Sequence, residues 1–121
     1  MSLVQREMLI NNGQALAGVR FIDDTLAAAA TAYTLKPSEQ TVCILSGAVG
    51  DTVITLPTVG DAAGLIYSIA LITDGGQDVT VNDYGDDSRV AFTAVTMDTV
   101  LDYILLYCDG QRWFTLASEV A

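Results

Sequence analysis

The chain has 121 residues, about half of them apolar, and carries five basic and fifteen acidic residues, for a formal net charge of −10. This length suits one domain with a substantial core, and the apolar content excludes a disordered chain. Binding to phosphate groups relies on clustered Lys and Arg residues, and the chain has too few of them to form a basic patch. We therefore expect neither nucleic acid nor an anionic membrane as a partner. No apolar run reaches the ~18 residues of a membrane span, and no signal-peptide pattern is present.

The first third of the chain differs from the rest. Residues 1–16, MSLVQREMLINNGQAL, show no sustained period of 2 or 3.6, whereas VRFIDDT at 19–25 predicts a short strand with Val19 and Phe21 on one face. LAAAATAY at 26–33 suits a short helix through its alanines, and equally an extended segment packed closely against a neighbour. We expect residues 1–31 to form an N-terminal arm or extension that becomes ordered on a partner surface.

Strand signals become regular from residue 32 onward. Period-2 alternation is clear in DTVITL and QDVTVND, while LIYSIALIT and YILLYC are apolar on both faces. Such two-sided strands are central, or have one face covered by another subunit. The predicted strands cover residues 32–36, 41–46, 51–56, 65–73, 77–84, 88–97, 102–108 and 112–118. Residues 32–121 are therefore predicted to form an all-β domain, an antiparallel β-sandwich or barrel-like module with no room for βαβ crossovers.

A hairpin is predicted in YILLYCDGQRWFTL, residues 103–116. Asp-Gly between two alternating runs is a strong hairpin signal, because a type I′ turn needs positive φ at both central residues. Gly tolerates positive φ freely, and Asp tolerates it better than most residues. We therefore expect Asp109 and Gly110 at the centre of the turn.

The residues of common catalytic and metal sites are missing or badly spaced. There is no histidine, so Cys43 and Cys108 lack the usual base partner; both lie in apolar strand-like runs and are expected to be buried free thiols, with one bridge left open. Asp83, Asp86 and Asp87 cluster near a glycine, but without EF-hand spacing a solvated turn is favoured over a Ca²⁺ site. We expect no cofactor, no metal and no enzymatic activity; a carboxylate-based glycan hydrolase would require two facing acids.

Aromatic residues offer two interpretations. Tyr67, Tyr84, Tyr103, Tyr107 and Trp113 could form a sugar-binding platform. Tyr103 and Tyr107, however, lie an even number of positions apart and share one strand face, which favours packing in a core or a subunit interface.

Three segments, in order, resemble a recurring pattern in tailed-phage structural proteins. Residues 51–73, DTVITLPTVGDAAGLIYSIALIT, combine a strand closing on Leu-Pro, a Gly/Ala loop and an apolar strand. Residues 75–87, GGQDVTVNDYGDD, carry a Val-Thr-Val strand, and residues 103–116 end in an apolar strand, Asp-Gly and Trp. The ordered set is similar to capsid decoration (cement), head-fibre and tail-fibre modules.

The resemblance implies a homotrimeric virion protein on the outer capsid surface, which stabilises the head by bridging subunits of the major capsid protein. Lattice proteins of this kind commonly grip their neighbours with an N-terminal arm, which makes apolar residues of that region capsid-contact candidates: Leu3, Val4, Met8, Leu9, Ile10 and Phe21. The subunit-interface candidates are aromatic: Tyr67, Tyr103, Tyr107 and Trp113. The alternative is a head- or tail-fibre module that binds a host surface glycan.

Overall fold

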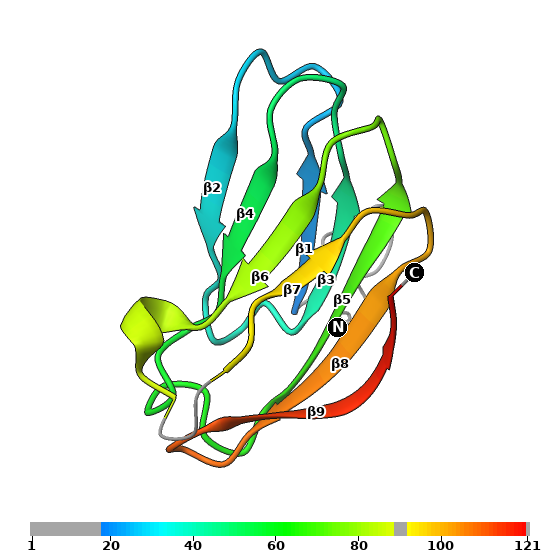
Figure 1. The fold of residues 1–121 in the computed structure, drawn as a ribbon. Coiled ribbons are helices and arrows are strands. Elements are labelled where there is room, and N and C mark those ends of the chain that lie inside the picture. The colour runs from blue at the N-terminus through cyan, green and yellow to red at the C-terminus, as the bar shows by residue number, and fades with distance from the viewer. Residues whose placement is uncertain (1–17, 89–91, 121) are drawn as a thin grey trace, which may run out of the picture.

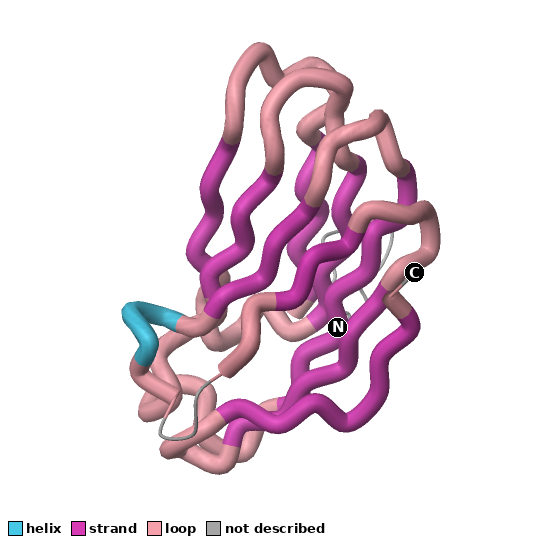
Figure 2. The backbone as a smooth tube through the Cα atoms, viewed as in Figure 1, coloured by secondary structure: helices cyan, strands magenta, loops and turns pink. Residues whose placement is uncertain are grey.

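The computed structural model describes residues 18–88 and 92–120, which form two facing β-sheets (Figure 1). Strands dominate the described backbone, in which the single short helix is a 3₁₀ turn at one end (Figure 2). In chain order the elements are β1 (Val19–Asp23), β2 (Thr31–Thr34), β3 (Thr41–Leu45), β4 (Thr52–Thr55), β5 (Ile66–Thr73), β6 (Val79–Asn82), η1 (Tyr84–Asp86), β7 (Val95–Met97), β8 (Tyr103–Cys108) and β9 (Trp113–Glu119). The predicted all-β fold is confirmed.

The chain alternates between the two sheets. The five-stranded sheet, sheet A, has the order β1-β3-β5-β8-β9, and the four-stranded sheet, sheet B, has the order β2-β4-β6-β7. From β1 to β6, consecutive strands therefore belong to opposite sheets. Only β6–β7 and β8–β9 are consecutive strands within one sheet. Since both sheets are open at their edges in the described part of the chain, the module is a sandwich rather than a closed barrel.

The strand directions differ in part from the antiparallel module that we predicted. Pairs β5–β8, β6–β7 and β8–β9 are antiparallel, but β1–β3, β3–β5, β2–β4 and β4–β6 are parallel. Parallel neighbours need a crossover connection, usually a helix. Here a strand of the opposite sheet makes the crossover, which explains why parallel pairing occurs without helices.

The core lies between the sheets and uses the inward-facing residue of each alternating pair. Fully buried positions include Ile44 and Ile69 on sheet A, and Ile54 and Val81 on sheet B. Leu56, Pro57 and Ala62 close the same core after β4. Ile54, Leu56, Ile69 and Val81 come from the segments in which period-2 alternation is clearest or both faces are apolar.

A buried carboxylate connects the two sheets. Asp24 follows β1 and is 3% exposed. Its Oδ2 accepts hydrogen bonds from the hydroxyls of Thr31 and Thr52, both at 2.5 Å, and its Oδ1 accepts one from Tyr33 at 2.7 Å. Burial raises the pKa of Asp24, but the bonds from Thr31, Thr52 and Tyr33 outweigh burial and hold the pKa below its ordinary value. The charge is thereby stabilised at the point where the chain leaves sheet A for sheet B.

The alanine-rich segment at 26–33 is a close-packed loop followed by a strand, not a helix. Residues 24–30 form turns and bends, and β2 begins at Thr31. Gly50, in the next crossover loop, has φ +80°, and a Cβ there would lie 2.3 Å from backbone atoms of Ala29 and Ala30. The small residues therefore let one crossover loop pack directly on the next, as the second of the two interpretations requires.

The boundary of the predicted arm falls inside the sandwich. β1 pairs with β3 from Val19 to Asp23, and β2 pairs with β4 from Thr31 to Thr34. The arm predicted over residues 1–31 therefore contains β1 and the start of β2, while residues 1–17 lie outside the described residues. Within residues 18–88 and 92–120, no helix is long and apolar enough to cross a membrane.

The hairpin is confirmed, with its turn one residue later than predicted. Cys108 pairs with Trp113, and the N–H of Asp109 donates to the carbonyl of Arg112 at 3.2 Å. The central residues are thus Gly110 and Gln111, and of these only Gly110 has positive φ, at +98°. Positive φ at the first central residue alone is the pattern of a type II′ turn. Asp109 instead accepts hydrogen bonds from the backbone N–H groups of Gln111 and Arg112.

Candidate interaction surface

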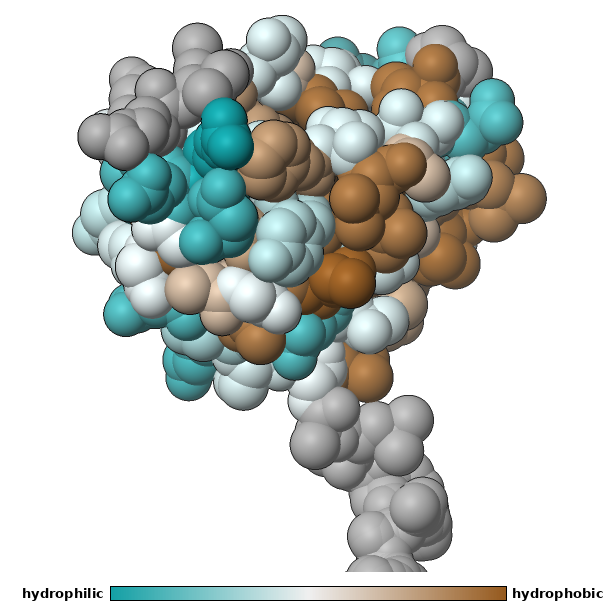
Figure 3. All heavy atoms as spheres, turned by 90° about the horizontal axis from the view of Figure 1, so that it is seen from below, coloured by the Kyte–Doolittle hydropathy of each residue, from teal (hydrophilic) through white to brown (hydrophobic). Residues whose placement is uncertain are grey.

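The outer face of sheet A is the surface of sheet A that points away from sheet B. Successive side chains of a strand point to opposite faces, so residues between the buried positions face outward. On the three central strands, β3, β5 and β8, these are mostly apolar: Thr41, Cys43, Leu45, Ile66, Ser68, Ala70, Ile72, Tyr103, Leu105 and Tyr107. In the view from below, apolar side chains gather toward one side of the visible surface and polar ones mostly toward the other (Figure 3).

Strand register aligns these side chains in rows across the sheet. Phe21, Cys43, Ala70 and Tyr103 occupy one row from β1 to β8. A second row runs from Val19 on β1 through the polar Thr41 and Ser68 to Leu105 on β8 and Ala117 on β9. Phe21 is 61% exposed, and Tyr103 is 40% exposed. All five strands therefore contribute apolar side chains to this face, which two small hydroxyl side chains interrupt.

Charge is confined to the margin of the outer face of sheet A. None of the ten outward residues on β3, β5 and β8 is Asp, Glu, Lys or Arg. Asp23 lies at the end of the edge strand β1, and Glu119 lies near the end of the other edge strand, β9. Hydrogen bonds from the hydroxyl and backbone N–H of Thr25 hold the pKa of Asp23 below its ordinary value. A chain with a net charge of −10 thus keeps the centre of this face neutral.

The outer face of sheet B has a different chemistry. Thr34, Thr55 and Asn82 form one row, and Val53 and Thr80 belong to the next. These side chains are short, and most of them carry a hydroxyl or amide group that can hydrogen-bond to water. The two outer surfaces of the sandwich therefore differ in polarity, and only that of sheet A exposes large apolar side chains over several adjacent strands among the described residues.

Aromatic contacts order one end of the outer face of sheet A. The rings of Tyr107 and Phe114 stack with centroids 6.3 Å apart and an interplanar angle of 20°. The Arg112 guanidinium lies 4.7 Å from the centroid of Phe114. Its Nε also donates to the carboxylate of Asp109 at 3.1 Å. The positive charge is thereby paired within the hairpin, next to the aromatic pair.

A strained residue lies at the other end of this face. Leu101 has φ +72°, the only positive φ of a non-glycine residue in the described ranges, and is 67% exposed. Its N–H donates to the carbonyl of Leu71, while the N–H of Leu71 donates to the carbonyl of Asp102. Leu101 and Asp102 therefore both lie opposite Leu71, as in a β-bulge just before the start of β8. Left-handed backbone is costly for leucine, so an apolar side chain is held in water by a strained conformation.

The predicted subunit-interface residues separate into two groups. Tyr67 is fully buried and Trp113 nearly so, and their rings meet edge to face with centroids 5.4 Å apart. The hydroxyl of Tyr67 donates to the carbonyl of Pro37 at 2.7 Å. Both residues thus belong to the core of the single chain. Tyr103 and Tyr107 lie on the outer face of sheet A, as their even spacing predicts.

Of the predicted capsid-contact residues, only Phe21 lies in the described part of the chain, on the outer face of sheet A. The other five lie outside the described residues: Leu3, Val4, Met8, Leu9 and Ile10. Sequence reasoning missed the contribution of Cys43, Ala70 and Leu105 to the same face. Two-sided apolar strands signalled a covered second face, but only strand register could show which residues share a row.

The two cysteines are free and differ in environment. Cys108 is buried, and burial raises the pKa of its thiol. Cys43 is only half-buried and lies on the outer face of sheet A. The expected buried thiol is thus confirmed for Cys108 and is wrong for Cys43.

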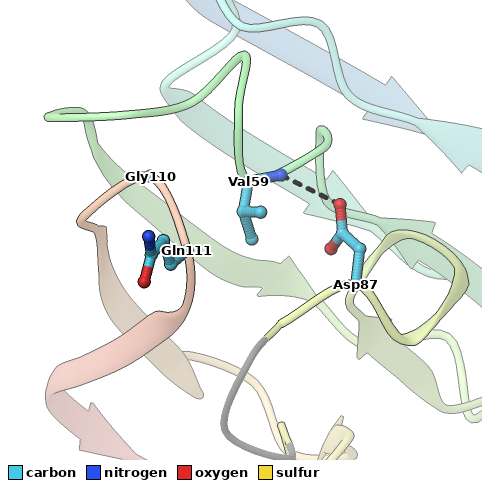
Figure 4. Close-up of a pocket in the computed structure, with 4 residues that line it drawn as sticks. All are labelled: Val59, Asp87, Gly110 and Gln111. Carbon is cyan, nitrogen blue, oxygen red and sulfur yellow. Dashed lines mark hydrogen bonds between the residues drawn. The ribbon is translucent and has the colours of Figure 1, made fainter.

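A shallow hollow of about 370 Å³ lies between the hairpin and the loop after β4 (Figure 4). Its lining includes Val59, Asp87, Gly110 and Gln111. The Oδ2 of Asp87 accepts a hydrogen bond from the N–H of Val59 at 3.0 Å. Among these four lining residues Asp87 is the only ionisable one, so the hollow does not present the two facing acids that glycan hydrolysis requires.

The acidic cluster at residues 83–87, predicted to be a solvated turn, is a turn in which carboxylates accept hydrogen bonds from backbone N–H groups. Asp83 is 8% exposed, and its Oδ2 accepts a hydrogen bond from the N–H of Ser88. Asp87 binds Val59, as described above, so these two carboxylates do not face a common site. No group of three or more His, Cys, Asp or Glu residues suited to a metal ion occurs in residues 18–88 and 92–120.

Comparison of the chain with protein-family models, with curated proteins and with solved structures gave no match. The sequence pattern and the surfaces of the sandwich are therefore the basis for proposing a function.

Proposed function

We propose that the protein is a non-catalytic structural component of a tailed-phage virion, a decoration (cement) protein. As a homotrimer it binds the outer surface of the capsid and stabilises the head by bridging subunits of the major capsid protein. The observation that carries the proposal is the outer face of sheet A. A homotrimer needs a surface through which its copies associate, and an uncharged apolar sheet face is suited to this, because its burial is the main source of the binding free energy.

The segments with the phage-like pattern supply the scaffold of this surface. Residues 51–73 contain β4 and β5, residues 75–87 contain β6 and η1, and residues 103–116 contain β8 and the start of β9. β5 and β8 are adjacent central strands of sheet A. β5, β8 and the start of β9 therefore belong both to the resembling segments and to the candidate surface.

Sedimentation with empty heads that lack decoration protein tests the proposal. The full chain should pellet with these heads at micromolar concentration and should raise the temperature at which they rupture. Heads already saturated with the protein are the control and should take up no more. Failure to bind undecorated heads at micromolar concentration would refute the capsid assignment.

A deletion of residues 1–17 tests the role assigned to the N-terminal region. Because β1 begins at Val19, the deletion removes no described strand, so the far-ultraviolet circular dichroism of the sandwich should persist. Its affinity for heads should fall at least about tenfold, since the removed segment holds five of the six predicted capsid contacts. Equal affinity of the full and the truncated chain for heads would contradict the capsid-binding role of the N-terminal arm. Binding to a host glycan, without binding to heads, would support the fibre alternative.

A further inference from the structure

We infer that the outer face of sheet A is the surface through which three copies of this chain associate, with their three faces turned toward a common axis. The inference rests on the trimer of the proposed function and assigns it to specific residues. It also separates self-association from capsid binding, which the proposal gives to the N-terminal region.

The outer face of sheet A exposes large apolar side chains. Eight of the ten outward residues on β3, β5 and β8 are apolar or aromatic, all but Thr41 and Ser68, and Phe21, Ile66, Tyr103 and Phe114 are each more than a third exposed. Large contiguous apolar patches are uncommon on monomers and mark interaction sites. Five hydrogen-bonded strands give the patch a regular, nearly rigid surface, so little ordering entropy opposes its burial.

The distribution of charge over the outer face of sheet A favours a second copy of this chain over another class of partner. A basic partner would be drawn to carboxylates, yet the outward residues of β3, β5 and β8 include none. Two copies each carrying −10 repel one another, so they can meet at short range only where charge is absent. The centre of the outer face of sheet A meets this condition and offers apolar area to offset the remaining repulsion.

Backbone strain at Leu101 is also explained by association. An exposed leucine held at φ +72° gains nothing in the isolated chain, because the conformation is costly and the side chain stays in water. Leu101 lies just before the start of β8, at the same end of sheet A as the exposed Ile72. In the assembly the same side chain would be buried, so the strain would be compensated by association.

Three sheets arranged in this way enclose a closed apolar interior. Each chain in a threefold ring contacts both neighbours, here through two halves of the same face. Cys43 and Ala70 are paired neighbours near the middle of that face, so both would lie in the interior. The reactivity of the Cys43 thiol therefore reports whether this face is buried. A charged side chain at position 70 would prevent the three faces from associating.

The test compares two glutamate substitutions at half-buried positions on central strands. Ala70→Glu places a carboxylate on the outer face of sheet A, and Thr80→Glu, the matched control, places one on the outer face of sheet B. Light scattering should give three times the chain mass for wild type and for Thr80→Glu. Ala70→Glu should give the chain mass, with association at least about 100-fold weaker, because a buried unpaired charge is costly. Circular dichroism verifies that both variants are folded.

Thiol labelling supplies the second measurement. Maleimide should modify Cys43 at least about tenfold more slowly in the wild-type trimer than in Ala70→Glu, since burial blocks access to the thiol. Cys108 is buried within the single chain, so its labelling should be slow in both proteins. If Ala70→Glu does not fold, the concentration dependence of Cys43 labelling in wild type gives the same answer.

The outcomes distinguish this inference from the proposed function. A wild-type monomer, a wild-type dimer, or an Ala70→Glu variant that remains trimeric with Cys43 equally accessible would each overturn the inference. Any of these results together with binding to heads would leave the capsid assignment intact. A trimer that Ala70→Glu dissociates, but that does not bind heads, would support the inference and refute the capsid assignment.

Discussion

Replacement of Asp24 by asparagine tests whether the buried carboxylate holds the two sheets together. Asparagine has nearly the same shape as aspartate, so the substitution changes charge and hydrogen bonding with little change in packing. The hydroxyls of Thr31 and Thr52 share Oδ2 in the native protein, and Tyr33 binds Oδ1. The Asp24→Asn variant would offer these three donors one neutral acceptor oxygen, and an NH₂ group would stand in the place of the other.

The expected cost follows from the three hydrogen bonds. A bond to a charged group contributes about 1.5–3 kcal/mol, and a neutral one about 0.5–1.5 kcal/mol. A loss of about 1 kcal/mol per bond lowers the free energy of unfolding by about 2–3 kcal/mol at neutral pH. Domains of this size have about 5–15 kcal/mol in total, so the variant should remain folded, with a Tm lower by about 8–12 °C.

Urea unfolding of wild type and Asp24→Asn across a range of pH values measures this cost. The pKa of Asp24 is lowered in the folded chain, since its hydrogen bonds outweigh burial, so the folded carboxyl binds protons more weakly than the unfolded one. Its contribution is therefore fully present above the unfolded pKa of about 3.9 and is lost as pH falls through the lower folded value. The stability difference between the two proteins should narrow below about pH 4.

Two results would refute this reasoning. One is a loss of less than about 0.5 kcal/mol at neutral pH, within the range of ordinary surface substitutions. The other is a difference that stays constant in acid. Asp23→Asn, at the exposed neighbouring position, is the matched control and should destabilise the protein less.

Three further predictions concern backbone strain and burial. Gly50→Ala should lower the free energy of unfolding, measured with urea, by about 3 kcal/mol or more, because its Cβ would lie 2.3 Å from backbone atoms of the preceding crossover loop. The control Gly60→Ala, whose Cβ would have no atom within 4 Å, should change the same free energy by less than about 0.5 kcal/mol. Leu101→Gly should raise the free energy of unfolding of the isolated chain by about 1 kcal/mol through relief of strain, and a decrease would show that contacts of the leucine outweigh the strain. Burial raises the pKa of Tyr67 to about 12, so an absorbance titration should show a step there that Tyr67→Phe lacks, and stability should fall as pH rises from about 10 to 12; a Tyr67 step near pH 10 would contradict its burial.

Local patterns predicted the strands well, because alternation is a property of each strand by itself. DTVITL and QDVTVND became β4 and β6, and Asp109–Gly110 marked the β8–β9 hairpin. The position of the turn was less predictable. Asp109 is held outside the central pair by hydrogen bonds from Gln111 and Arg112, and such side-chain bonds leave little trace in a dipeptide pattern.

Strand direction and the composition of the surface could not be predicted in the same way. Parallel pairing of β3 with β5 depends on β4 crossing to the opposite sheet, which is a property of the whole chain. Even spacing placed Tyr103 and Tyr107 together, since both belong to one strand. Their proximity to Cys43 and Ala70 depends on register between distant strands, and the burial of Tyr67 and Trp113 depends on which face of each strand meets sheet B.

The alternation of strands between sheets also has a consequence for how the chain folds. Thr31 pairs with Thr52 and Val42 with Ile69, partners that lie far apart along the chain, so the parallel pairs all close long loops. The entropy of loop closure is lost before such contacts form, which makes folding slow for chains of this kind. The β8–β9 hairpin closes over only a few residues and is the natural site of nucleation. During synthesis that hairpin emerges from the ribosome after β1 to β7, so the central strand β5 lacks its antiparallel partner β8 until then.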